Sequence, residues 1–446
     1  MVTPRPVVTR DITLDLHRVM ADNTASNPDT FDESLDAGTL PLWSNLTTRP
    51  VTSGGLRTIT TGYLTSPGGA SPPYEYDLAF ASPAGVIGPQ RWVASPAGLA
   101  AVHASFYQDV RSTGGWMPVA LFGFQIGPIT IFFVNTYPFR LPRSLTQYFS
   151  AGRALFWDNS YYQSIANLTG GQADAWRTFS PGQVTTQQWN AYPLHPAPSV
   201  SMPGNPFSIL PSASRAGNTL TLDIAPFGDN TPGHTGTGFT DPGPNGCQCT
   251  ITGSYQLSQN GKTIASGNAA AGGTDLFLQA GLSGRPATIA FTLTAARAGR
   301  QYPLSAASQT TWTWRSRREP GARVPLPWTC ANFTQGCAVQ PLLTLRYQVR
   351  GLALDGSVRP GPQQIEVTAG HLQLAPAAPI TRLTAQVSVN DGKTWQNATV
   401  TAAGAGHFEV AFTAPPRALV SLQVHAADAA GGQITETITR GYQTAP

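Results

Sequence analysis

The most regular feature of this chain is the alternation of apolar and polar residues over short runs. It is clear in TLTLDIAPF (219–227) and in LLTLRYQVRGLAL (342–354), and it recurs in LRTITTGYL (56–64) and YEYDLAFA (74–81). A period of two residues is typical of a β-strand with one buried face. Clusters of Gly, Pro, Asn and Ser separate the runs, as in SPGGASPP (66–73). The pattern therefore predicts an all-β protein built from antiparallel strands.

Two short stretches predict β-hairpins. Asn260-Gly261 lies inside YQLSQNGKTIASG (255–267), and Asn-Gly is a strong signal for a type I′ turn. VSVNDGKTW (387–395) follows S-x-[DN]-x-G-x-T-W, close to the Asp box of sialidases, with Asn390 at the Asp position. A propeller would repeat such a box with a fixed period, and this chain has a single copy. We interpret it as a sandwich hairpin whose turn is Asn390-Asp391-Gly392.

Length and proline-rich connectors indicate more than one domain. The 446 residues exceed what one hydrophobic core usually serves, which is about 250–300 residues. The connectors are YPLHPAPSVSMPGNPF (192–207) and REPGARVPLP (318–327). We therefore predict three consecutive antiparallel β-sandwich-like domains: an aromatic-rich domain over 1–195, a sandwich over 206–318, and an immunoglobulin- or fibronectin-III-like sandwich over 325–446.

Composition agrees with this class and narrows the partners. Charged residues make up 11% of the chain, against about 25% in an average domain, while hydrophobic residues make up 41%. Enough apolar surface is present to bury cores, so general disorder is not expected. The net charge is +4. The densest basic cluster, Arg315, Arg317 and Arg318, is short, and we interpret it as a solvated linker. No nucleic-acid partner is expected.

The four cysteines are candidates for disulfides. Cys330 and Cys337 can close a loop if their Cα atoms approach within about 7 Å. Cys247 and Cys249 are too close in sequence for a relaxed bond to each other. Zinc sites need spacings or additional histidines that this chain does not show. Disulfides in an exported protein are our preferred interpretation, and buried free thiols are the alternative.

Neither a membrane span nor a signal peptide is expected. The most apolar segment, VALFGFQIGPITIFFV (119–134), is shorter than the approximately 20 residues of a spanning helix, and Gly127-Pro128 interrupts it. The first residues, MVTPRPVVTRDITLDLHRV, contain no continuous apolar run. The composition is nevertheless that of an exported protein. We therefore expect an extracellular protein in which this chain is the downstream part of something longer.

No catalytic motif is recognisable. The chain has no G-x-S-x-G, no H-E-x-x-H, and none of the subtilisin motifs D-[ST]-G, H-G-T-H and G-T-S-M-A. PGHTGTG around His234 only partly echoes the second of these, and the seven histidines are scattered singly. A calcium site involving Asp229 and Asp241 is conceivable, although a plain loop is the simpler interpretation. We expect no cofactor.

Aromatic side chains of the first block are the remaining candidates for binding. Most of them should be core residues. The stretch RALFWDNSYY (153–162) offers Trp157, Tyr161 and Tyr162 as candidate ligand-facing aromatics, because aromatic platforms bind sugars or extended peptides.

The end of the chain resembles a known family. VSVNDGKTWQNATV (387–400) and VSLQVHAADAAGGQITETITRGYQ (420–443) look like the C-terminal tail of large secreted subtilisin-like (S8 family) serine proteases of actinobacteria. ALFWDNSYYQS (154–164), GQVTTQQWNAYPLHP (182–196) and LRYQVRGLALDGSVRPGPQQIEV (345–367) resemble segments upstream of that tail. The resemblance implies a β-rich accessory region that follows a protease domain. It carries no catalytic residue onto this chain.

Two functions are therefore expected, in this order. The first is a non-catalytic accessory region that binds substrate or a surface, or stabilises the protease; its partners are the protease domain of the same parent chain or a protein substrate. The alternative is a stand-alone extracellular protein that binds polysaccharide or cell wall.

Overall fold

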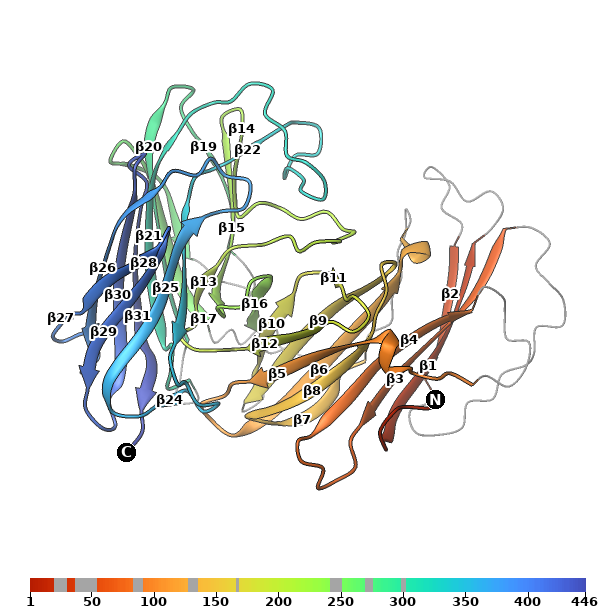
Figure 1. Cartoon of the computed structure of the whole chain (residues 1–446). Coiled ribbons are helices and arrows are strands. Elements are labelled where there is room, and N and C mark those ends of the chain that lie inside the picture. Colours follow the sequence, from red (N-terminus) through yellow and green to blue (C-terminus); the bar gives the residue numbers. More distant parts are fainter. Residues whose placement is uncertain are drawn as a thin grey trace.

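The computed structural model describes residues 1–19, 30–36, 54–82, 91–126, 135–165, 168–240, 251–268, 276–297 and 302–446. Within these ranges the protein is almost entirely β, which confirms the predicted fold class. Its helical content there is limited to the short 3₁₀ helices η1 (Pro96–Gly98) and η2 (Gly123–Gln125). The strands form antiparallel sheets in two lobes, an N-terminal lobe in red to yellow and a C-terminal lobe in green to blue (Figure 1).

The N-terminal lobe contains two sheets. The larger has, in spatial order, β12 (Val184–Trp189), β5 (Leu99–Phe106), β8 (Arg143–Ser150), β4 (Tyr74–Ser82), β3 (Gly55–Thr65), β1 (Val8–Val19) and β2 (Thr30–Asp36). The smaller has β16 (His234–Thr240), β10 (Leu168–Asp174), β9 (Leu155–Ile165), β6 (Ser112–Phe122) and β7 (Tyr137–Leu141), with β11 (Arg177–Thr178) against β9. Most pairs are antiparallel, whereas β12 with β5 and β4 with β8 are parallel.

The C-terminal lobe contains a large sheet and two smaller ones. The large sheet has β18 (Lys262–Asn268), β17 (Ile251–Gln259), β20 (Ala287–Arg297), β21 (Ala307–Ser316), β31 (Gln433–Thr444), β30 (Leu419–Asp428), β26 (Ile380–Ser388) and β27 (Gln396–Asn397), with β24 (Ser357–Val358) beside β31. A second has β13 (His195–Ala197), β15 (Thr219–Gly228), β14 (Ala213–Ala216) and β22 (Ala338–Val339), with β19 (Leu276–Gly281) beside β15. The third has β23 (Leu343–Val349), β25 (Gly361–His371), β29 (His407–Ala414) and β28 (Thr399–Gly404).

The large sheet joins the segments 206–318 and 325–446, for which we predicted separate sandwiches. β21 of the first segment pairs with β31 of the second, from Ala307 opposite Thr439 to Thr313 opposite Gln433. Strand β16 from the first segment pairs instead with β10 of the N-terminal lobe. The predicted boundaries therefore do not coincide with the sheets, because backbone pairing between distant strands crosses both connectors.

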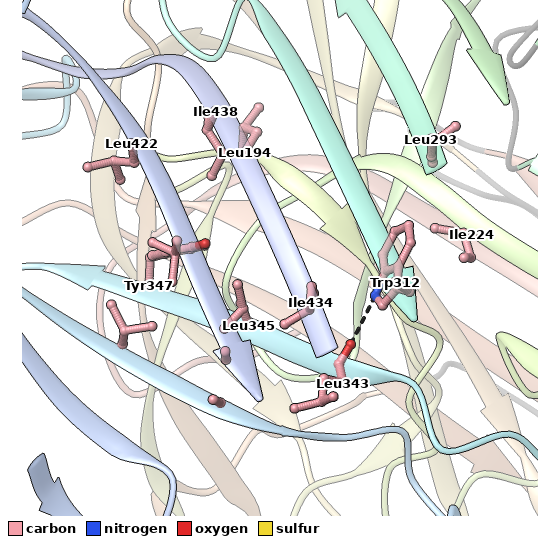
Figure 2. Close-up of a cluster of buried hydrophobic side chains, with 14 of the residues drawn as sticks. Leu194, Ile224, Leu293, Trp312, Leu343, Leu345, Tyr347, Leu422, Ile434 and Ile438 are labelled. Carbon is pink, nitrogen blue, oxygen red and sulfur yellow. Dashed lines mark hydrogen bonds between the residues drawn. The ribbon is translucent and has the colours of Figure 1, made fainter. Parts of the chain in front are cut away.

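One hydrophobic core accordingly serves the whole C-terminal lobe. Figure 2 shows Ile224, Leu293 and Trp312 from the first segment among Leu343, Leu422 and Ile438 from the second. Leu194, from the proline-rich connector, is fully buried in the same cluster. Full burial of one such leucine or isoleucine stabilises the fold by about 1.5–3 kcal/mol. The proline-rich connector 192–207 therefore contributes to the core through Leu194 and is not a free linker along its whole length.

Local turn chemistry agrees with the two predicted hairpins. Asn260 and Gly261 have φ angles of 49° and 79°, the positive pair that a type I′ turn requires. Asp391 and Gly392 have φ angles of 59° and 77° at the tip that follows β26. Glycine is favoured at 392 because its φ of 77° lies in the left-handed region that L side chains rarely adopt.

None of the described helices is long and apolar enough to cross a membrane. The first residues of the apolar segment 119–134 form the end of β6. The helix η2 follows β6 within the same segment. Residues 127–134 of that segment lie outside the described ranges.

Candidate functional site: a histidine-lined cavity between the lobes

A cavity of about 290 Å³ lies where the two lobes meet. Its walls come from β13, from the turn leading into β16, and from β23 and the end of β25. The apolar part of the lining is Pro198, Val200, Pro232, Leu345 and Leu372. The polar part includes His195, Asp229, His234, Arg346, His371 and Gln373. Each of the three histidines is paired with a carboxylate.

His234 is held by Asp229, which lies five residues before it. Its Nδ1 lies 2.9 Å from one carboxylate oxygen and 3.0 Å from the other. The same carboxylate accepts hydrogen bonds from the main-chain N–H groups of Asn190 at 2.7 Å and Thr231 at 2.9 Å. The Gln187 side-chain nitrogen lies 3.0 Å from Nε2, so the amide donates there and the ring donates from Nδ1 to Asp229. The imidazole is therefore fixed in orientation and in tautomer.

Indole stacking adds to this constraint. The ring of His234 stacks on Trp189 with centroids 4.1 Å apart, and both side chains are buried. Gln187 and Trp189 lie on β12, whereas His234 opens β16, so the pair joins the two sheets of the N-terminal lobe.

His195 pairs with Glu436 across the C-terminal lobe. Nδ1 of the histidine lies 3.2 Å from Oε1 of the glutamate, and both side chains are almost fully buried. Nε2 lies 3.0 Å from Oδ1 of Asn230, to which it donates. Burial is the largest effect on the pKa of His195 and lowers it, but Glu436 and Asn230 together outweigh burial, so the pKa is raised.

Glu436 is the centre of a wider buried network. Tyr347 donates its hydroxyl to Oε1 at 2.9 Å, and Thr310 donates to Oε2 at 2.8 Å. Burial, followed by the charge of Glu436, raises the pKa of the Tyr347 phenol well above its ordinary value. The network therefore holds a neutral tyrosine and a carboxylate directly behind the cavity wall.

The third pair, His371 with Asp428, has a structural role. Nε2 of His371 lies 2.9 Å from Oδ2 of Asp428. The other oxygen of Asp428 accepts from the main-chain N–H groups of Ala430 at 2.9 Å and Gly432 at 2.7 Å. Asp428 thus closes the turn between β30 and β31 and at the same time anchors the end of β25 beside the cavity.

These three pairs do not form a nucleophilic triad. A serine-type triad places the histidine between a carboxylate and a hydroxyl or thiol. Among the described residues, the hydrogen bonds of these three imidazoles go to carboxylates and to the amides of Gln187 and Asn230. The same described residues contain no cluster of three or more His, Cys, Asp or Glu that could hold a metal ion. The arrangement fixes side chains around a cavity.

The cavity also meets an open sheet edge. β23 is the edge strand of its sheet and pairs with β25 on one side only. Leu342 and Arg350, which flank β23, form main-chain hydrogen bonds with Leu372 and Gln364 on the β25 side. Because antiparallel ladders alternate, Leu343, Leu345 and Tyr347 direct their main-chain groups toward the open edge.

Side chains form hydrogen bonds with that edge at both ends. Trp312 donates its indole N–H to the main-chain oxygen of Leu343 at 3.0 Å (Figure 2). Tyr347 donates its main-chain N–H to Oδ1 of Asn230 at 2.6 Å. Between them, Leu345 lines the cavity, and Arg346 beside it is exposed. Within the described part of the chain, no hydrogen bond joins the main-chain groups of Leu345 to a neighbour on this side, and the residue as a whole is 2% exposed.

The residues singled out from the sequence lie elsewhere. Trp157 and Tyr161 are 2% and 0% exposed within the N-terminal core, and the Trp157 indole donates to the main-chain oxygen of Ser150 at 2.9 Å. Tyr162 is half-buried. Packing in the core leaves the first two rings no surface for a ligand, because a β-strand that is buried on one face directs its large aromatics inward.

The structure describes two of the four cysteines. Cys330 and Cys337 form a disulfide with Cα atoms 5.8 Å apart. Cys247 and Cys249 lie outside the described residues, as does Asp241 of the conceived calcium site. Its other member, Asp229, is occupied by His234 and by main-chain donors.

Sequence reasoning missed the cavity because its histidines stand alone in the chain. His195 and Glu436 are separated by most of the C-terminal lobe, and only the sheet topology brings them together. Of the three pairs, only Asp229 and His234 are close in the chain, so only their contact could have been indicated by local sequence. No protein-family model matches the chain, and no curated protein matches it.

Proposed function

We propose that this chain is a non-catalytic, peptide-binding accessory region of a secreted subtilisin-like serine protease. Its cavity would hold an extended polypeptide segment against β23. The observation that carries the proposal is that no strand pairs with β23 on the side where Leu345 lines the cavity. An extended segment can add to an exposed strand edge through main-chain hydrogen bonds and place alternate side chains in a neighbouring pocket.

The lining indicates which segments fit. The walls contributed by Val200, Leu345 and Leu372 favour an apolar side chain in the cavity. Arg346 is exposed at the same wall and favours an acidic side chain, or a chain-terminal carboxylate, next to it. The resemblance of residues 387–400 and 420–443 to the tail of secreted proteases supports a protein substrate as the source of the segment.

Hydrogen exchange tests the binding mode directly. Peptides from a casein digest, with and without an acidic residue beside an apolar one, are added to the purified chain. We expect slower exchange at the Leu345 amide, because a paired strand edge is protected. Unchanged exchange at Leu345 with a bound peptide would overturn the assignment of the edge.

A charge variant tests the role of Arg346. We expect Arg346→Glu to weaken binding of acidic peptides about tenfold, because it replaces an attraction with a repulsion. Arg382→Glu, at an exposed arginine of β26, is the matched control and should bind as the parent does. Equal losses in both variants would indicate a non-specific charge effect.

Two further measurements address the accessory role. The chain is incubated with casein and with a serine-reactive phosphonate probe, and neither turnover nor labelling is expected; either one would overturn the non-catalytic assignment. The native product is then mapped by peptides from the culture supernatant. A product that also carries a subtilisin-like domain is expected, whereas a product without one would contradict the link to a protease.

A further inference from the structure

Two large apolar side chains protrude from one segment of the C-terminal lobe. Leu326 is 88% exposed and Phe333 is 82% exposed, more than any other large apolar side chain in the described residues. Both lie in the segment between β21 and β22, drawn in cyan at the top of Figure 1. Single exposed apolar residues are ordinary, so their surroundings decide whether they have a function.

Phe333 is held in a closed loop. The disulfide between Cys330 and Cys337 joins the two ends of that loop. Inside it, the Asn332 side-chain oxygen accepts hydrogen bonds from the main-chain N–H of Thr334 at 3.0 Å and from its hydroxyl at 2.8 Å. A cross-link of this kind removes much of the freedom of the loop. The phenyl ring is therefore presented to solvent at small further cost in entropy.

The base of the segment is anchored to the lobe. Trp328 is 4% exposed and forms an isolated bridge with Ile209. The main-chain N–H of Thr329 donates to the oxygen of Ile209 at 2.9 Å. Along the chain, Leu326 precedes this anchored point and Phe333 follows it.

Exposed arginines lie within this segment, at the end of β21 and in the turn before β20. They are Arg285, Arg315, Arg317, Arg318 and Arg323. The fold brings the turn before β20 to Arg318, whose guanidinium carbon would lie 3.7 Å from a Cβ at Gly284. Arg323 packs against the disulfide loop, with its Cγ 3.4 Å from a Cβ placed at Gly336. The cluster therefore extends beyond Arg315, Arg317 and Arg318, the short group that the sequence alone indicated.

Few negative charges offset this cluster. From 283 to 339 the chain contains a single acidic residue, Glu319. Its carboxylate lies 3.5 Å from the guanidinium of Arg317, and that pair is exposed. The remaining arginines leave the segment that carries Leu326 and Phe333 with a net positive charge.

We propose that this end of the lobe docks on an anionic lipid bilayer. Leu326 and Phe333 would enter the boundary between headgroups and acyl chains, and the arginines would contact lipid phosphates. A soluble polyanion would use the arginines alone, because an aliphatic side chain such as Leu326 gains nothing from it. This inference is independent of the cavity and of its peptide.

Vesicle co-sedimentation tests the proposal. The purified chain is mixed with vesicles of phosphatidylcholine, with or without about 30 mol % phosphatidylglycerol, in about 0.1 M salt. We expect binding to the anionic vesicles only. The double variant Leu326→Ser/Phe333→Ser and the double variant Arg315→Glu/Arg323→Glu should each lose at least about tenfold in affinity.

Matched controls come from the other lobe. Val184→Ser removes an apolar side chain that is 68% exposed, and Arg153→Glu reverses an exposed charge. Both controls should bind vesicles as the parent does. Absence of binding to anionic vesicles would overturn the proposal. So would binding that the Leu326→Ser/Phe333→Ser variant retains in full, together with equal binding to heparin, since that result would identify a general polyanion site.

Discussion

Nδ1 of His195 lies 3.2 Å from Oε1 of Glu436, and this contact joins β13 to β31, the last strand of the chain. Both side chains are buried, and Tyr347 and Thr310 donate to the same carboxylate. The relationship fixes one wall of the cavity. It also makes the stability of the lobe depend on pH.

We predict that Glu436→Gln destabilises the protein by about 3–5 kcal/mol near neutral pH, because it leaves a buried histidine without its charge partner. The raised pKa of His195 also sets the direction of the pH effect. The stabilisation is complete below the unfolded pKa of about 6.5 and is lost as the pH rises through the folded value. The difference in Tm between parent and variant should therefore shrink as the pH is raised from about 5.5 to 9. A constant difference across that range would contradict the pairing.

Asp158 gives a second pH-dependent prediction. Burial, followed by the nearby charge of Asp174, raises the pKa of Asp158 to about 7. A carboxyl with a raised folded pKa binds its proton more tightly in the native state, so stability falls as the pH rises from about 4 to 7. Asp158→Asn mimics the protonated acid. We expect it to stabilise the protein by about 2–4 kcal/mol at pH 8, and by much less near pH 4.

Thermal unfolding at both pH values checks this prediction. Asp223→Asn is the comparison variant, since burial raises the pKa of that carboxyl without a neighbouring acid. A stabilisation of Asp158→Asn that is independent of pH would show that the side chain is not titrating between the two conditions.

The hairpin after β26 depends on the Asn390 side chain. Its oxygen accepts from the Ser388 hydroxyl at 2.9 Å and from the Thr394 main-chain N–H at 3.0 Å. Its nitrogen donates to the Thr394 hydroxyl at 2.8 Å. We predict that Asn390→Ala costs about 1–3 kcal/mol. Asn390→Asp should cost less, because a carboxylate keeps both acceptor roles. Chemical denaturation of the two variants measures the difference, and equal losses would contradict it.

Removal of the disulfide is expected to loosen the loop between Cys330 and Cys337. By the loop-entropy argument, the double variant Cys330→Ala/Cys337→Ala loses about 2–3 kcal/mol. Limited proteolysis should then cut near Phe333, which is already exposed in the parent. Thermal unfolding measures the first effect, and mass spectrometry of the digest measures the second. Resistance to proteolysis in the variant would show that Trp328 and Thr329 alone hold the segment.

The proposed accessory role and the proposed peptide site rest on different observations. The resemblance rests on residues that form a hairpin and the strands β30 and β31. The cavity rests on β13, β16 and β23, which the resemblance covers only loosely. The peptide and vesicle experiments therefore test two surfaces that a single accessory region would use for different partners.

The sequence by itself determined the strands, because alternation of apolar and polar residues is a local consequence of the β-pleat. It also located the turns at Asn260-Gly261 and Asp391-Gly392, where positive φ angles demand those residues. Tertiary structure alone decided that β21 pairs with β31, and hence that two predicted sandwiches share one sheet and one core. It alone paired His195 with Glu436 and brought the turn at Gly284 beside Arg318. Such contacts join residues far apart in the chain, and their energies depend on which strand edges meet, which a period of two cannot encode.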